Sequence, residues 1–316
     1  MDQTILEVNN LKKYYSTGGG QVYAVDGINF SINDGETLGL VGESGCGKST
    51  TGRTLIRLVE PTGGEIKYKN TDIVKLNKKE MREIRKQMQI IFQDPYSSLD
   101  PRKSVGETIG KPLQIYRIGS KSERELEVDR LMDLVGLSEN LYNKYPHELD
   151  GGRRQRVGIA RALALEPDFI VCDEPVSALD VSIQAQILNL LENLQNDLGL
   201  TYLFIAHDLS VVKHISNRIA VMYLGKMAEI ADSNELFKNP KHPYTQALLS
   251  AIPIPKLNKK EREKVILKGT VPSAISPPSG CRFHTRCIHK KPICEEIVPE
   301  LKEIDKDHQV ACHLYN

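Results

Sequence analysis

The sequence predicts an α/β fold in which helices cover both faces of a mainly parallel β-sheet. Short apolar runs alternate along the chain with segments of helical periodicity. A glycine-rich segment, residues 42–50, separates one apolar run from a segment that we expect to be helical. Two later apolar runs end at Asp173 and His207, and the carboxyl ends of strands are where ligands bind in open α/β sheets.

The first strands are expected near the N-terminus, at residues 4–8 and 28–32, where apolar and β-branched residues gather. Residues 36–41 form a continuous apolar run that ends in glycine, which predicts a buried strand. The segment 51–60 follows the glycine-rich turn and is expected to be a helix.

A longer helix is predicted at residues 121–137. Ser122 and Glu125 form a candidate capping box at its start. Apolar residues then recur at helical spacing, which predicts one buried face. These residues are Val128, Leu131, Met132 and Val135.

The last third of the sheet is predicted from two apolar runs, residues 168–175 and 201–208, with a helix between them. An apolar stripe from Ile183 to Leu198 marks this helix, and Gly199 ends it. Residues 254–280 are rich in proline and lysine and predict a linker. We therefore expect a main domain at 1–253 and a cysteine-rich tail at 281–316.

Composition limits the classes of function. The 316 residues include 42 Lys and Arg against 41 Asp and Glu, so we expect no nucleic-acid partner bound over a large surface. No apolar run approaches the ~18 residues of a membrane span, and no signal peptide is visible. We expect a cytosolic protein that is able to dock on a membrane protein.

The segment GESGCGKST fits the phosphate-binding pattern G-x-x-x-x-G-K-[ST] between a predicted strand and helix. Its backbone N–H groups converge on phosphate oxygens, Lys48 reaches the β- and γ-phosphates, and the Ser49 hydroxyl holds Mg²⁺. The alternative is a glycine-rich turn without function, which the flanking elements argue against. The expected nucleotide contacts are Gly42, Ser44, Gly45, Cys46, Gly47, Lys48, Ser49 and Thr50.

Three side chains at strand ends are candidates for a role in the hydrolysis of the nucleotide. Asp173 offers Mg²⁺ a hard oxygen ligand, and Glu174 is placed to orient or polarise an attacking water. The alternative for this acid pair is a helix N-cap. His207 is expected to contact the γ-phosphate, although a lone histidine is usually structural.

Together these motifs resemble the ATPase subunits of ABC transporters, from about Ile5 to Ser250. That family implies a P-loop NTPase (RecA-like) core, a β subdomain and an α-helical subdomain at about residues 95–160. Tyr15 resembles the aromatic residue that stacks on adenine, with Tyr14 or Tyr23 as alternatives. The resemblance assigns further nucleotide contacts to Gln93 in IIFQDP, to Asp150, Gly151 and Gly152 in the signature motif, and to Asp180 in SALD. It also implies that Gln93 ligates Mg²⁺.

Within that family, QDPYSSLDPR, DEPVSALDVSIQAQILNLL and residues 239–253 look like oligopeptide and dipeptide importers. The chain resembles the second, F-type ATPase subunit of such an importer. This implies peripheral attachment at the cytoplasmic face of the membrane and ATP hydrolysis that powers peptide uptake. The implied partners are a D-type ATPase subunit, two integral membrane permease subunits and an extracytoplasmic peptide-binding protein.

The signature motif departs from the family pattern L-S-G-G-Q. Here it reads Leu149-Asp150-Gly151-Gly152-Arg153. In the family the serine hydroxyl donates to the partner's ATP, which an ionised carboxylate cannot do. Aspartate is also a favourable helix cap, so Asp150 can have that role as well or instead.

Four of the six cysteines, Cys281, Cys287, Cys294 and Cys312, lie in the last 36 residues. Such a cluster suggests metal binding in a cytosolic chain, and its spacing leaves zinc, an iron–sulfur cluster or no metal open. The family resemblance favours a [4Fe–4S] cluster bound by all four.

Two other functions compete with the transport ATPase. One is a soluble ABC ATPase acting on ribosomes or DNA, although the paired ATPase halves or long coiled coil common in such proteins are not visible. The other is a redox or nucleic-acid module built on the tail, against which a complete ATPase motif set argues.

Overall fold

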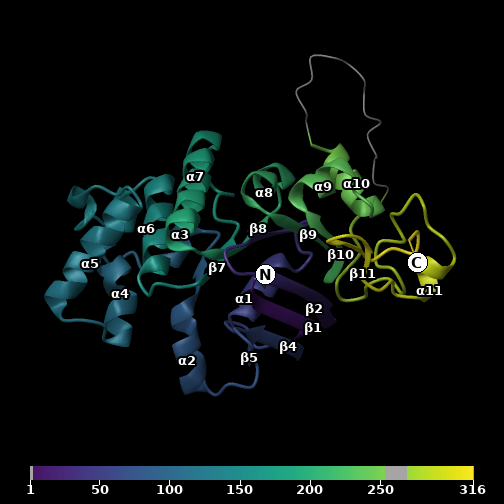
Figure 1. Ribbon diagram of the computed structural model, residues 1–316, viewed down its shortest axis with the longest axis horizontal. Coiled ribbons are helices and arrows are strands. Elements are labelled where there is room, and N and C mark those ends of the chain that lie inside the picture. Colours follow the sequence, from purple (N-terminus) through teal and green to yellow (C-terminus); the bar gives the residue numbers. More distant parts are fainter. Residues whose placement is uncertain (1–2, 253–268, 316) are drawn as a thin grey trace, which may run out of the picture. The chain divides into compact units, whose positions relative to one another are not determined.

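The structure is a computed structural model that describes residues 3–252 and 269–315 (Figure 1). Residues 254–268 of the predicted linker lie outside the described part. The chain forms two compact units, the first made of residues 1–75 and 204–316 and the second of residues 76–203. Among the described residues, none of the helices combines the length and the apolar character that crossing a membrane requires.

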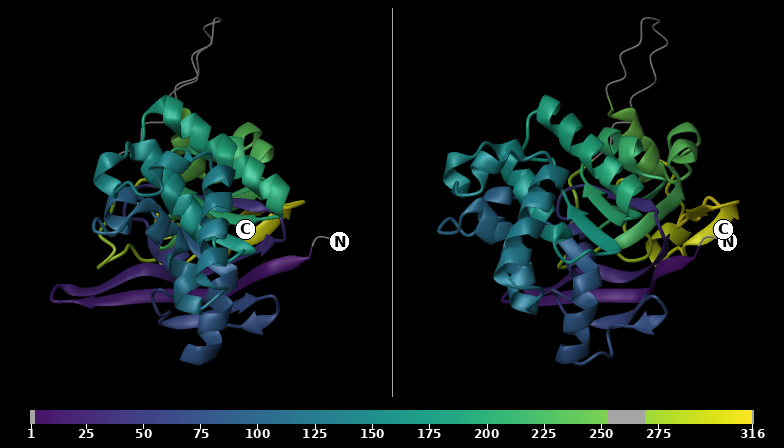
Figure 2. Two further views of the ribbon diagram at one scale, coloured as in Figure 1. Left: turned by 90° about the vertical axis from the view of Figure 1, so that its left-hand side faces the viewer. Right: turned by 60° about the vertical axis from the view of Figure 1, so that its left-hand side comes forward.

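The first unit contains an antiparallel sheet with the strand order β2-β1-β4-β5. Its strands are β1 (Thr4–Thr17), β2 (Gly20–Asn33), β4 (Gly63–Tyr68) and β5 (Thr71–Asp72). Figure 2 shows β1 and β2 as a long two-stranded ribbon, in purple. Sequence reasoning predicted only residues 4–8 of β1 and 28–32 of β2, so it found one end of each strand.

A second group of strands in this unit carries the core. The buried strand β3 (Thr37–Val41) pairs in parallel with β9 (Arg218–Tyr223), and β10 (Lys226–Asp232) pairs antiparallel with β9. The tail adds β12 (His308–Val310) beside β10 and β11 (Lys302–Asp305) beside β12. The helices of this unit are α1 (Lys48–Leu55), α8 (Leu209–Ile215), α9 (Ser233–Lys238), α10 (Pro243–Ser250) and α11 (Ile293–Glu296).

The second unit is mostly helical. Its strands β6 (Met88–Ile91) and β7 (Phe169–Asp173) pair in parallel, and β8 (Thr201–Ala206) begins in this unit and ends in the first. Helix α4 packs against both α5 and α6 (Figure 1). The helices are α2 (Lys78–Gln87), α3 (Pro95–Ser98), α4 (Val105–Tyr116), α5 (Lys121–Leu134), α6 (Gly151–Leu163) and α7 (Val181–Leu198), with short 3₁₀ turns at Glu139–Leu141 and Pro146–Glu148.

The helix boundaries test the local rules. The predicted apolar face of α5 is buried, but the capping box was misplaced by two residues. Ser120 accepts a bond from the Glu123 N–H at 3.3 Å, and Glu123 accepts one from the Ser120 N–H at 2.6 Å. Gly199 ends α7 as predicted, with a left-handed φ of 68°. The helix that begins after the phosphate loop ends at Leu55, earlier than expected.

Candidate functional site

The phosphate loop, residues Gly42–Thr50, connects β3 to α1 within the first unit. The Lys48 ammonium donates to the Gly42 carbonyl at 2.7 Å and to the Glu43 carbonyl at 3.2 Å, and the residue is only 5% exposed. The loop therefore curls around its own lysine, as a cradle for phosphate oxygens requires.

Two glycines of this loop have no room for a side chain. A Cβ at Gly42 would lie 2.1 Å from the Met222 carbonyl, and a Cβ at Gly47 would lie 2.0 Å from the Ala24 carbonyl. Gly47 also has a left-handed φ of 109° and is the N-cap of α1, without a side-chain cap bond. The N-terminus of α1 thus offers the positive end of its dipole to an anion.

Cys46 lies in the same loop, and its side chain is buried as a packing residue. It is 3% exposed, and burial raises the pKa of its thiol in spite of the nearby Lys48. The contact predicted between Cys46 and the nucleotide would therefore be made by the backbone of Cys46. Cys172 in β7 is likewise buried.

The second unit brings together three of the predicted residues. Asp173 is fully buried at the end of β7, and Glu174 follows it with a left-handed φ of 47°. Gln93 donates from its amide Nε2 to Glu174 Oε2 at 2.9 Å. A non-glycine residue in this backbone conformation is strained, and such strain is concentrated at functional sites.

This arrangement suits the chemistry predicted for it. The bond from Gln93 fixes the Glu174 carboxylate and leaves the amide oxygen of Gln93 as the type of ligand that Mg²⁺ takes. The Asp173 carboxylate and the Ser49 hydroxyl are further oxygen ligands of the expected kind, Asp173 in the second unit and Ser49 at the start of α1 in the first. Each of these oxygen atoms, within its own unit, is of the type that Mg²⁺ takes as a ligand.

The other predicted contacts of the first unit are exposed. His207 follows the fully buried strand β8 and is itself exposed. Tyr15 is 37% exposed, with the Lys13 ammonium 4.8 Å from its ring centre. Tyr14 instead donates to Asp26 at 2.5 Å and meets the Tyr23 ring edge-on. Tyr15 takes no part in the contact between the Tyr14 and Tyr23 rings. Its stacking on adenine stays a prediction.

Asp150 is the N-cap of α6 in the second unit. Its Oδ1 accepts the Arg153 N–H at 2.7 Å, and its Oδ2 lies 3.3 Å from Arg153 Nε. A Cβ at Gly152 would lie 2.7 Å from a methyl group of Ile183 in α7, so close helix packing explains this glycine. Gly151 is less restricted, with 3.0 Å to Leu179.

Asp180 caps a helix in the same way. Its carboxylate accepts the Ile183 N–H at 3.0 Å and the Ser182 hydroxyl at 2.7 Å. The bond from the Ile183 N–H is the main cause of the lowered pKa of Asp180. Its predicted place near a nucleotide at a dimer interface stays a prediction.

Sequence reasoning missed residues that hold the phosphate loop from outside the motif. Tyr244 in α10 accepts the Glu43 N–H with its hydroxyl oxygen at 2.9 Å. Arg286 in the tail binds the Glu43 carboxylate. Nothing in the local sequence signals either contact, because each partner lies more than about 200 positions away.

The predicted [4Fe–4S] cluster is wrong. Within residues 3–252 and 269–315, no three His, Cys, Asp or Glu side chains are placed to hold a metal ion. Burial raises the pKa of Cys281 to about 11, and it also raises the pKa values of Cys287 and Cys312. The backbone carbonyl of Cys294 accepts the Cys281 N–H at 2.8 Å.

Comparison with known proteins decides the family. Residues 25–177 match the ABC transporter family, and residues 228–294 match the oligopeptide/dipeptide transporter C-terminal region. The chain is 54% identical to the oligopeptide transport ATP-binding protein AppF of Bacillus subtilis, over 99% of this chain and 98% of that protein. The chain belongs to the ATP-binding proteins of ABC transporters. It is therefore an ATP-binding ATPase of this family.

Further relatives of this ABC ATPase agree. It is 48% identical to the oligopeptide transport ATP-binding protein OppF of Salmonella typhimurium, over 98% of this chain and 96% of that protein. The dimeric ATP-binding cassette MJ0796, solved with ADP and Pi, superposes with a TM-score of 0.67 and 32% identity, covering 72% of this chain and 98% of that one. The structure of CbiO1 from Clostridium perfringens superposes with a TM-score of 0.67 and 30% sequence identity, covering 76% of this chain and 92% of that one.

These matches confirm the predicted fold class and family. They support the transport ATPase over a soluble ABC ATPase acting on ribosomes or DNA, because the full-length relatives are transport proteins.

Proposed function

We propose that this chain is the F-type subunit of an ABC importer, hydrolysing ATP to power the uptake of di- and oligopeptides. The observation that carries the proposal is the match over nearly the whole chain to oligopeptide transport ATP-binding proteins, which extends through the C-terminal region. The chain would work at the cytoplasmic face of the membrane, attached to two permease subunits. An extracytoplasmic binding protein would deliver the peptide.

The proposed chemistry is the attack of water on the γ-phosphorus of ATP. Glu174 orients the water and takes its proton while the bond from the γ-phosphorus to the bridging oxygen breaks and ADP leaves. Lys48 and His207 would contact the phosphate oxygens and stabilise their negative charge. Ser49, Gln93 and Asp173 would bind Mg²⁺. The bond from Gln93 and the strained backbone of Glu174 support the placement of the catalytic carboxylate.

The proposed second ATPase subunit is a D-type chain, so that two nucleotides lie between two different subunits. A partner's ATP that faces the signature motif of this chain would meet Asp150. Two unit negative charges ~4 Å apart repel by about 4 kcal/mol at an effective dielectric near 20, an upper figure because Arg153 pairs with Asp150 and both are exposed. We therefore propose an asymmetric pair. ATP held by this chain is hydrolysed, and ATP held by the partner turns over slowly.

The test is to tag this chain in its own cell, solubilise the membranes in mild detergent and purify the assembly. We expect two integral membrane proteins and a second ATPase in equal amounts, together with ATP-dependent uptake of a labelled dipeptide after reconstitution. Recovery with ribosomes or DNA would support the competing function instead. Uptake that persists in cells lacking this chain would contradict the proposal for peptides.

A further inference from the structure

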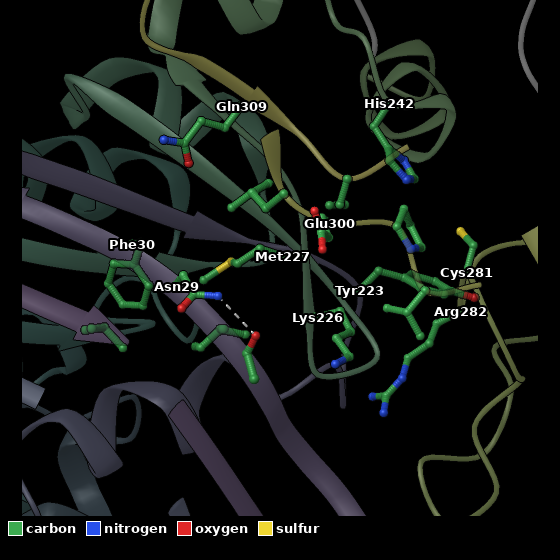
Figure 3. Close-up of a pocket in the computed structure, with 18 of the residues that line it drawn as sticks. Asn29, Phe30, Tyr223, Lys226, Met227, His242, Cys281, Arg282, Glu300 and Gln309 are labelled. Atoms are coloured by element: carbon green, nitrogen blue, oxygen red, sulfur yellow. Dashed lines mark hydrogen bonds between the residues drawn. The ribbon is translucent and has the colours of Figure 1, made fainter. Parts of the chain in front are cut away.

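The C-terminal tail is held against the first unit through two arginines that lie four positions apart. Arg282 contacts the Leu224 carbonyl and the Asp26 carboxylate, which Lys226 also pairs with at 3.1 Å. Phe283 packs against the rings of both Tyr223 and Tyr244, with ring centres 5.3 and 5.4 Å away. Beside these contacts lies a cavity of about 730 Å³, where Lys226 and Arg282 extend toward the same side (Figure 3).

Arg286 reaches the phosphate loop itself. Its Nη1 lies 2.7 Å from Glu43 Oε2 and its Nη2 lies 3.1 Å from Glu43 Oε1, a two-bond pair across 243 positions. The Arg286 side chain is 7% exposed and that of Glu43 is 25% exposed. The pKa of Arg286 is raised, chiefly by its bond to Glu43. A planar guanidinium bound in this way fixes both the place and the charge of the carboxylate.

The position of Glu43 gives this pair a consequence for ATP. Glu43 follows Gly42 in the loop, and its own carbonyl oxygen accepts a bond from the Lys48 ammonium at 3.2 Å. A carboxylate at this point adds a negative charge to a loop that must receive the phosphates of ATP. Arg286 offsets this charge from the tail by binding both oxygens of the carboxylate.

We propose that Arg286 is a positioning residue for nucleotide binding, through which the tail neutralises and orients Glu43 in the phosphate loop. The tail is then part of the ATP site and not only an appendage to it. The proposal rests on ATP binding at the loop and is independent of the solute that the transporter carries.

The experiment measures the affinity of the purified full chain for ATP by displacement of a fluorescent ATP analogue. Arg286→Met leaves Glu43 unpaired, and we expect ATP to bind about tenfold more weakly, with a smaller loss at high salt. Arg286→Lys keeps the charge but loses the two-bond geometry, so we expect an intermediate loss. Glu43→Gln removes the repelling charge, and we expect ATP to bind at least as tightly as to the parent chain.

Two further variants separate this role from a general loss of structure. The double variant Arg286→Met with Glu43→Gln should recover affinity to within about threefold of the parent. Arg282→Met breaks the matched contact of the tail to Asp26, outside the phosphate loop, and should stay within the same range. The proposal is overturned if Arg286→Met binds ATP like the parent, if Glu43→Gln fails to rescue it, or if Arg282→Met loses as much.

Discussion

The phosphate loop and the signature segment both place glycines at the start of a helix, yet they differ in what meets the helix N-terminus. Before α1, Gly47 has no side chain to cap the helix, and Lys48 lies inside the loop. Before α6, Asp150 caps the helix with its own carboxylate and pairs with Arg153. The first N-terminus is open to a phosphate, whereas the second already has a negative group. Similar local patterns thus predict opposite behaviour toward ATP.

The largest effect is expected at the acid that serves the ATP bound by this chain. Glu174→Gln keeps the shape of the side chain but removes its capacity to take a proton. We expect ATP hydrolysis by the assembled transporter to fall by at least about 100-fold, with ATP affinity nearly unchanged. A rate within about threefold of the parent would remove Glu174 from catalysis.

A pair of glycine variants compares the two helix starts directly. Gly47→Ala places a Cβ against the Ala24 carbonyl in a left-handed conformation, and we expect ATP affinity to fall by about tenfold to 100-fold. Gly151→Ala meets only the mobile end of Leu179 and should leave the ATP affinity of the isolated chain unchanged. Affinities would be compared after the melting temperature shows that both variants fold. Equal losses would mean that the two turns do not differ in their tolerance of a side chain.

The proposed asymmetry predicts unequal losses from matched lysine variants. Lys48→Ala removes the cation from the site that faces the partner's signature motif, so we expect most transport-coupled hydrolysis to be lost. The matching lysine variant in the partner should reduce hydrolysis about tenfold less than Lys48→Ala does, since the partner's ATP faces Asp150. Both would be measured in the reconstituted assembly, and equal effects would argue for two equivalent sites.

The smallest effects are expected at Asp150 itself. We expect the isolated chain to be a weak ATPase, because its own signature motif carries Asp150. Asp150→Ser removes the charge but keeps a capping oxygen, so this activity should rise at least about threefold while stability is retained. Asp150→Ala also removes the cap and should lower the free energy of unfolding by about 1 kcal/mol. Steady-state hydrolysis and denaturant unfolding separate the two roles. An unchanged rate in Asp150→Ser would leave Asp150 as a cap alone.

Sequence alone determined the features that depend on neighbouring residues. The phosphate loop between a buried strand and a helix, the cap at Asp150, the end of α7 at Gly199 and the buried face of α5 all follow from patterns a few positions long. The misplaced cap of α5 marks a limit even there. Ser120 and Ser122 both have a glutamate three positions later, and in the structure Ser120 is the N-cap of α5.

Tertiary structure decided what distant residues do. The bond from Gln93 to Glu174 spans 81 positions, and the pair between Arg286 and Glu43 spans 243. The spacing of the four tail cysteines suggested a metal site, but no such site is formed in the described residues. Local patterns act through backbone bonds within one turn, whereas charge pairing and burial depend on which segments the folded chain brings together.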